Sequence, residues 1–177
     1  MKSTPKFLLM LLLLAGMSMQ CCRAELSELQ VKSAYVFNFI KFVEWPDKAL
    51  KTGDKLSLCV IGNDEQLASL STLNGRKAGT HELLVMRADR SKVWNTCHVL
   101  YIGKREQRRL IPVFKSLGAA PVLTISDIPG FAERGGGIGL FHRKNKILFD
   151  VNIASTRKAG LRLSGQMLNL AAHIFGK

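Results

Sequence analysis

Few residues in this chain have the types and the spacing that catalysis or metal binding requires. The four histidines, His81, His98, His142 and His173, stand far apart, and none has a spacing typical of a metal site. The chain has no GxSxG sequence, which would mark a serine hydrolase. The glycine run at 135–137 lacks the lysine and the spacing of a nucleotide-binding loop. The sequence therefore predicts neither a metal, nor a cofactor, nor a catalytic set.

Three carboxylates could act as acid and base. Asp127 with Glu133 or with Asp150 would suit a small hydrolase, although a turn cap at Asp127 and a solvated Glu133 are the more ordinary interpretation. Asp150 is the one charged residue in the apolar run ILFDV. A buried carboxylate needs a partner. That partner could be Arg157 or Arg162 of this chain, or a polar group of a second protein.

These residues lie in the stretch 122–152, which combines strands with a long loop. Residues 122–125 form an apolar run that predicts a buried strand. A polar loop follows, contains Phe131 and ends in the glycine run. Residues 138–141 and 147–151 predict a β-hairpin. Phe131 either packs back into the core or is exposed as a binding anchor.

The elements before this stretch alternate between strands and helices, which predicts parallel βαβ units. We expect a doubly wound, mostly parallel α/β sheet covered by helices on both faces, with a C-terminal β-hairpin, in one domain. In this arrangement the second strand lies outside the first. The predicted strands are 56–61, 82–87 and 98–102, and the predicted helical segments are 65–73, 91–95 and 106–117.

Three strands of such a sheet end at the same edge, with Gly62-Asn63, Gly103-Lys104 and Ser126-Asp127. Open α/β sheets bind ligands at the carboxyl edge, where the strand order reverses. A small-ligand site at this edge is therefore one hypothesis, and its residues would be Asn63, Lys104, Ser126 and Asp127.

Two further helical regions flank the sheet. Residues 24–45 predict a long helix rich in aromatic residues, which either packs in the core or shares a face with a dimer or another partner. Pro46 should end this helix, since the residue before proline disfavours the α conformation. Residues 153–159 predict a helix, 161–163 a short strand, and 164–175 a last helix. The alternative is one continuous helix from Ile153. Gly160 and Gly165 argue against this alternative, because glycine disfavours a helix interior.

The first 24 residues predict a secretory signal peptide that is cut after Ala24, which leaves a mature domain of residues 25–177. A basic start precedes the apolar run FLLMLLLLA, which is far shorter than the roughly 20 residues that span a bilayer. A membrane anchor and a lipid attachment at Cys21 are the alternatives. The mature chain would keep 23 basic and 13 acidic residues, a net charge of +10. The basic residues are scattered without interleaved aromatics, so we do not expect nucleic-acid binding.

Export also bears on the cysteines. The mature chain keeps Cys59 and Cys97 and has no CxxC pair. In an oxidising compartment such a pair on neighbouring strands favours a disulfide over a metal or redox site.

Several short motifs follow one another between residues 34 and 171. They are AYVFNF at 34–39, KFVEWP at 41–46, LCV at 58–60 with Gly62, CHVLYI at 97–102, VLTISD at 122–127 with Gly130 and Phe131, the glycine run into Ile138, Phe149, Asn152, and AGL at 159–161. In this order, and behind a predicted signal peptide, they resemble the YfiR-like family of periplasmic proteins.

The resemblance implies a periplasmic regulator and not an enzyme. Characterised members of that family are α/β domains, often dimeric, that repress an inner-membrane diguanylate cyclase by binding its periplasmic region. An outer-membrane lipoprotein can sequester the repressor, after which cyclic di-GMP rises and favours biofilm. Cys59 and Cys97 match cysteines that form a disulfide in such proteins, whereas the second cysteine pair of some relatives is missing here.

The sequence thus supports three hypotheses. The first is a repressor that acts by protein contact, through a surface built from Phe131, Phe141, Arg143, Phe149 and Asp150. The second is a small-ligand receptor that uses the carboxyl edge of the sheet. The third is a small periplasmic hydrolase that uses Asp127 or Asp150.

Overall fold

A mostly parallel sheet of eight strands forms the centre of the computed structural model, which describes residues 27–89, 91–144 and 146–177. The spatial order of the strands is β10-β8-β7-β6-β5-β2-β4-β3. Their bounds are β2 Leu56–Ile61, β3 Lys77–Ala78, β4 His81–Arg87, β5 Val99–Ile102, β6 Leu123–Ser126, β7 Ile138–Arg143, β8 Lys146–Asn152 and β10 His173–Phe175. A separate two-stranded ladder pairs β1 (Val43–Glu44) with β9 (Arg162–Leu163).

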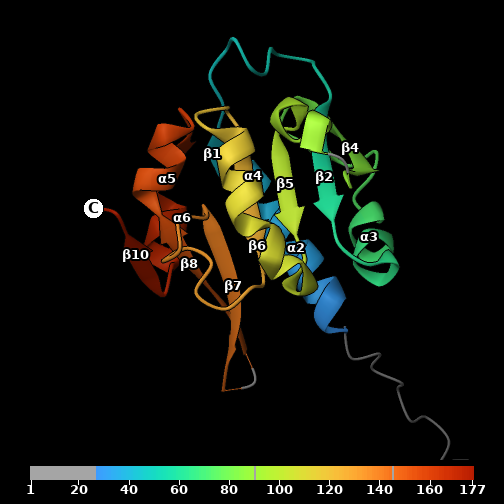
Figure 1. The fold of residues 1–177 in the computed structure, drawn as a ribbon. Coiled ribbons are helices and arrows are strands. Elements are labelled where there is room, and N and C mark those ends of the chain that lie inside the picture. The colour runs from blue at the N-terminus through green and yellow to red at the C-terminus, as the bar shows by residue number, and fades with distance from the viewer. Residues whose placement is uncertain (1–26, 90, 145) are drawn as a thin grey trace, which may run out of the picture.

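Helices cover both faces of the sheet (Figure 1). They are α2 Glu28–Lys41, α3 Asp64–Ser71, α4 Leu110–Leu117, α5 Ile153–Lys158 and α6 Gly165–Leu170, with the 3-10 segments η1 Ser91–Thr96 and η2 Lys104–Arg109. Leu58 and Val60 of β2 belong to the core cluster that includes residues of α2 and α3. Cys59 and Ile61 belong to the cluster that includes residues of α4. The alternation along one strand confirms the predicted sheet with two covered faces.

The doubly wound topology is also confirmed. Strand β2 pairs in parallel with β4 on one side and with β5 on the other. The second major strand of the chain therefore lies outside the first, and the strand order reverses between β2 and β5. Strands β6 and β7 continue the parallel sheet, and β8 returns antiparallel to β7 as the predicted hairpin.

The first helix is shorter than predicted. Ser27 caps α2 through a reciprocal capping box with Gln30, and the predicted start at Ala24 lies outside the described residues. The helix ends at Lys41, since Val43 and Glu44 leave it to pair with Leu163 and Arg162 of β9. The prediction of a helix as far as Trp45 was wrong because a β-ladder to a segment more than 100 residues away takes over the last turn.

The C-terminal region also differs from the prediction. The break at Gly160 is confirmed, because α5 ends at Lys158 and Gly160 adopts a φ of +71°. The predicted helix 164–175, however, ends at Leu170, and His173, Ile174 and Phe175 pair in parallel with Asp150, Val151 and Asn152 of β8. Hydrogen bonds to β8, which would otherwise be the edge of the sheet, stabilise the strand in place of the last helical turns.

A disulfide joins Cys59 of β2 to Cys97, which lies just before β5, and the two Cα atoms are 6.0 Å apart. Both residues are buried in the core cluster on the α4 side of the sheet. The bond therefore ties together the two strands between which the strand order reverses.

No helix among residues 27–89, 91–144 and 146–177 is long and apolar enough to cross a membrane. The predicted signal peptide of residues 1–24 lies outside these ranges.

Candidate functional site

The carboxyl edge of the sheet brings together the residues of the predicted ligand site. Strands β2, β5 and β6 are parallel neighbours, so Asn63, Lys104, Ser126 and Asp127 follow strand ends at one edge, as expected. Two of the four side chains, those of Asn63 and Ser126, form hydrogen bonds with backbone groups of the protein. Asn63 Oδ1 accepts a hydrogen bond from the Gln66 N–H at 3.0 Å and caps α3. Ser126 Oγ donates to the Ile102 carbonyl at 2.6 Å and accepts from the Ile128 N–H.

The Gln66 side chain fills the place where the strand order reverses. A Cβ atom on Gly103 would lie 2.2 Å from Gln66 Oε1, and one on Gly62 would lie 2.4 Å from the same atom. The two glycines therefore make room for a side chain of the protein itself. Gln66 Oε1 accepts a hydrogen bond from the Asn63 N–H, which completes the capping box of α3 and closes this part of the edge.

A buried ion pair closes the edge beside β6. Lys32 of α2 places its Nζ 2.6 Å from Asp127 Oδ2 and 2.5 Å from Glu28 Oε1. The side chains of Lys32 and Asp127 are only 10% and 7% exposed. The cavity beside Lys32, Gln66 and Tyr101 has a volume of about 10 Å³, which is room for one water molecule. Asp127 is thus held by Lys32, whereas the hydrolase hypothesis would pair it with Glu133 or with Asp150.

The charges at this edge shift the pKa values of three groups. Burial and the nearby Asp127 carboxylate raise the pKa of the Tyr101 hydroxyl well above its usual range. Burial opposes the charged form of Lys32, but hydrogen bonds to Asp127 and Glu28 outweigh it and raise the Lys32 pKa. A hydrogen bond from Lys32 lowers the pKa of Glu28. Within the described residues, Asp127 Oδ1 is buried and has no hydrogen-bond partner.

The glycine run at 135–137 allows close packing of the backbone against neighbouring groups. A Cβ atom on Gly136 would lie 2.1 Å from the Phe131 ring, and one on Gly137 would lie 2.9 Å from the Thr124 carbonyl. Phe131 itself is 1% exposed and packs against Phe114, with 5.8 Å between ring centroids. Of the two alternatives for Phe131, the structure therefore shows the core position, and Phe131 is not a surface anchor.

The outer half of the β7–β8 hairpin projects beyond the sheet. Strand β6 pairs with β7 only at Ile138 and Gly139, and β10 pairs with β8 only from Asp150 onward. Residues 140–144 and 146–149 therefore form a two-stranded ribbon that has no further strand neighbour within the described ranges, and Figure 1 shows it extending past the ends of β5 and β6. We call these residues the ribbon.

The inner face of the ribbon packs on α2. The Phe149 ring lies 4.8 Å from the Phe39 ring and 6.2 Å from the Tyr35 ring, measured between centroids. Tyr35 Oη donates a hydrogen bond to the Ile147 carbonyl at 2.8 Å. Phe149 is only 6% exposed. Its predicted place in a contact surface is therefore wrong for this conformation, because α2 covers the side chain.

The outer face of the ribbon carries the remaining predicted contact residues. Phe141 stands directly opposite Leu148 in the ladder, and both are half-buried. Arg143 stands opposite Lys146 near the turn, and both are exposed. Sequence reasoning missed Leu148 and Lys146. The cross-strand register of the hairpin is the signal that could have indicated them.

Asp150 lies at the base of this outer face, with a different partner from those predicted. Its Oδ1 is 2.7 Å from His173 Nδ1 of β10. Arg162 instead pairs with Glu44 at 2.9 Å, so the predicted salt bridge to Arg157 or Arg162 was wrong. His173 also stacks on Phe141, with 6.2 Å between the rings. The sequence did not indicate this partner, because the local pattern at His173 predicts a helix and not a strand beside β8.

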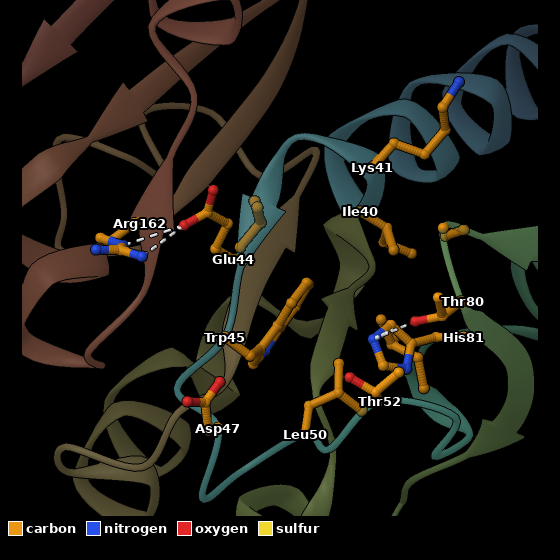
Figure 2. Close-up of a pocket in the computed structure, with 14 residues that line it drawn as sticks. Ile40, Lys41, Glu44, Trp45, Asp47, Leu50, Thr52, Thr80, His81 and Arg162 are labelled. Carbon is orange, nitrogen blue, oxygen red and sulfur yellow. Dashed lines mark hydrogen bonds and ion pairs between the residues drawn. The ribbon is translucent and has the colours of Figure 1, made fainter.

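A groove that the sequence did not indicate lies at the opposite, amino edge of the sheet. Its volume is about 490 Å³, which is within the range of ligand pockets. Figure 2 shows Trp45 on one side, His81 and Thr80 on the other, and the Glu44–Arg162 ion pair at the end. The KFVEWP motif contributes to this groove, whereas in the sequence it indicated a helix end and the family resemblance but no pocket.

Among the residues that the structure describes, no three His, Cys, Asp or Glu side chains come together in a way that could hold a metal ion. His98 is engaged in the protein interior: its Nδ1 accepts from the Ser57 N–H at 3.0 Å and its Nε2 lies 3.0 Å from the Ala49 carbonyl.

Comparison with known proteins identifies a family and shows similarity to solved structures. A family model described as YfiR/HmsC-like matches residues 29–172, which is most of the chain. The crystal structure of a conserved domain protein from Vibrio cholerae O1 biovar El Tor aligns with a TM-score of 0.56 and 11% sequence identity. The alignment covers 85% of this chain and 61% of that one. At this identity the likeness concerns the fold alone.

Proposed function

Because the chain belongs to the YfiR/HmsC-like family, we propose that it represses an inner-membrane diguanylate cyclase by binding the periplasmic region of that enzyme. The family is one of periplasmic, non-catalytic regulators of diguanylate cyclase signalling. Repression would lower cyclic di-GMP and biofilm formation. Export by a signal peptide cut after Ala24, a homodimer and sequestration by an outer-membrane lipoprotein belong to the same proposal.

The projecting ribbon is the observation that supports a contact function. Its outer face combines a half-buried apolar pair, Phe141 and Leu148, with the exposed cations Arg143 and Lys146 and with Asp150 at its base. An apolar centre with a polar rim is typical of protein–protein interfaces. The proposed contact surface therefore keeps Phe141, Arg143 and Asp150, and excludes the buried Phe131 and Phe149.

The test is cellular cyclic di-GMP in the parent strain, in a deletion strain, and in the deletion strain complemented with the chain with or without residues 1–24. We expect cyclic di-GMP to rise on deletion and to return to the parental level only with the exported chain. Unchanged cyclic di-GMP in the deletion strain under several growth conditions would contradict the proposed function.

Two substitutions locate the surface in the same assay. Phe141→Ala should fail to restore repression, because it removes the apolar centre of the ribbon's outer face. Ile111→Ala is the matched control, since Ile111 is 79% exposed on α4 and does not belong to the ribbon. Equal repression by the two variants would show that the contact lies elsewhere.

The groove at the amino edge supports a second candidate function, the binding of a small amphipathic molecule. Its base contains the buried apolar side chains Ile40, Leu50 and Leu56, and its wall carries Trp45 and the Glu44–Arg162 pair. Thermal-shift screening should find molecules that raise the melting temperature of the parent protein. The shift should be lost in Arg162→Ala and kept in Arg157→Ala, whose side chain is exposed on α5. Ligand shifts that are the same in both variants would exclude the groove.

A further inference from the structure

The tip of the ribbon breaks a rule of strand pairing. Arg143 and Lys146 are direct cross-strand partners, and both are exposed. Like charges directly opposite each other in a ladder destabilise it, whereas opposite charges stabilise it. The free protein therefore keeps a repulsive pair at a position where one acidic residue in place of Arg143 or Lys146 would give an attractive pair.

The turn residue Lys144 breaks a second rule at the same place. Its φ of +47° is the one positive φ of a residue other than glycine in the described ranges. Tight hairpin turns that need a positive φ favour Gly, Asn or Asp. A third cation thus occupies a position that turn geometry disfavours for lysine. Local rules that are broken without a local gain are typical of functional sites.

The nearby carboxylates do not neutralise these cations. Glu28 pairs with Lys32 and lies 3.3 Å from His142. Asp150 pairs with His173 at the base of the ribbon. Across residues 27–89, 91–144 and 146–177, no ion pair involves Arg143, Lys144 or Lys146. The three positive charges are therefore available to an anionic partner.

We propose that the ribbon tip is a docking site for an acidic protein segment, which places carboxylates against Arg143, Lys144 and Lys146 and an apolar side chain against Phe141 and Leu148. The mixed face favours a protein over a lipid surface, because Phe141 and Leu148 are half-buried and therefore expose little apolar area for insertion among lipid chains. The chemistry of the partner follows from the ribbon. Only its identity as a diguanylate cyclase depends on the proposed function.

The first experiment measures the repulsion in the purified protein. Arg143→Glu should raise the melting temperature by about 1–3 °C at low salt, because it turns a like-charge pair into an opposite-charge pair. High salt should remove the gain by screening. Lys48→Glu is the control, since Lys48 is exposed near the amino edge of the sheet. If the melting temperature of Arg143→Glu falls or stays unchanged, the claim that Arg143 and Lys146 destabilise the ribbon tip by repulsion is wrong.

The second experiment measures recognition with defined probes. Amide chemical shifts are followed during titration with a synthetic peptide of four glutamates around one leucine, and separately with phosphatidylglycerol vesicles. The peptide should shift amides of residues 141–148. In the triple variant Arg143→Gln, Lys144→Gln and Lys146→Gln, its binding should weaken about tenfold, equivalent to about 1.4 kcal/mol. The matched triple variant Lys48→Gln, Lys51→Gln and Lys77→Gln should bind as the parent does.

Each result decides the matter. Equal loss in both triple variants, shifts spread over the whole surface, or binding to vesicles without binding to the peptide would overturn the proposal. Binding of the peptide at the tip together with unchanged cyclic di-GMP in the triple ribbon variant would leave the docking site standing and contradict the cyclase as its partner.

Discussion

Lys32 holds a buried positive charge between two carboxylates, and this ion pair closes the carboxyl edge of the sheet beside β6. Its ammonium group contacts Asp127 and Glu28, and the burial of Lys32 and Asp127 makes each depend on the other. Removing one partner of a buried pair leaves an uncompensated charge, which costs far more than the pair contributes. The contact also fastens α2 to the end of β6.

Lys32→Met should therefore lower the free energy of unfolding by about 3 kcal/mol. The variant leaves the Asp127 carboxylate buried without its cation. Urea denaturation measures the change. The double variant Lys32→Met with Asp127→Asn should recover most of the loss, because it removes both charges. A double variant as unstable as Lys32→Met would show that packing, and not charge, dominates at this position.

Glu28 adds a pH dependence. The hydrogen bond from Lys32 holds the pKa of the Glu28 carboxyl below its usual value. A group with a lowered pKa in the folded state stabilises the protein above its unfolded pKa, and this contribution is lost as the pH falls through the folded value. Stability should thus decrease in acid below the ordinary range of a glutamate. Glu28→Gln should flatten that acid limb in melting curves between pH 3 and 7. An unchanged limb would contradict the assignment.

The ribbon is the element on which the proposed function depends, and its two faces have separate roles. The inner face packs on Tyr35 and Phe39 of α2 through Phe149. The outer face carries Phe141, Leu148 and the cations. Since the residues of a strand alternate between faces, Phe141 of β7 and Phe149 of β8 lie on different faces of the hairpin and should differ in what their substitution impairs.

Phe149→Ala should destabilise the protein by about 3–5 kcal/mol, as expected for a buried phenylalanine. Phe141→Ala should cost clearly less stability, because Phe141 is half-buried, and should impair repression in the cyclic di-GMP assay. Chemical denaturation and the cellular assay together separate the two effects. Comparable loss of stability in both variants would contradict the two-face arrangement.

At the scale of the whole molecule, the disulfide links the two strands at which the sheet reverses its order. Cys59 and Cys97 are 38 residues apart in sequence, and the bridge restricts the unfolded chain across that loop. The paired variant Cys59→Ala with Cys97→Ala should lower the free energy of unfolding by about 4 kcal/mol in the loop-entropy description. Thermal melting of the parent protein with and without reductant provides the matched comparison. Equal melting temperatures under both conditions, with reduction verified by thiol titration, would contradict this role.

The molecule separates two kinds of site at opposite edges of one sheet. The carboxyl edge, where α/β sheets usually bind ligands, is filled by Gln66 and by the Lys32–Asp127 pair. A groove of about 490 Å³ lies at the amino edge, beside Trp45 and the Glu44–Arg162 pair. The ribbon projects at the carboxyl end, so partner contact and ligand binding would occur at different places.

The sequence by itself indicated the main strands of the sheet and placed the second of them outside the first. Continuous apolar runs, capping residues and turn glycines are local signals, and they indicated β2, β4, β5, β6 and the hairpin together with the helices between them. The Cys59–Cys97 pair was foreseeable for the same reason, because two cysteines in neighbouring apolar strands have few other partners in an oxidising compartment.

Only the tertiary structure decided which of these residues reach the surface. Lys32 and Asp127 are 95 residues apart, and no local pattern predicts that their charges meet. Phe149 and Phe141 have similar surroundings in the sequence, but α2 covers one and leaves the other half-exposed. The C-terminal segment follows β8 rather than its helical pattern, because hydrogen bonds across a sheet edge outweigh a weak local preference.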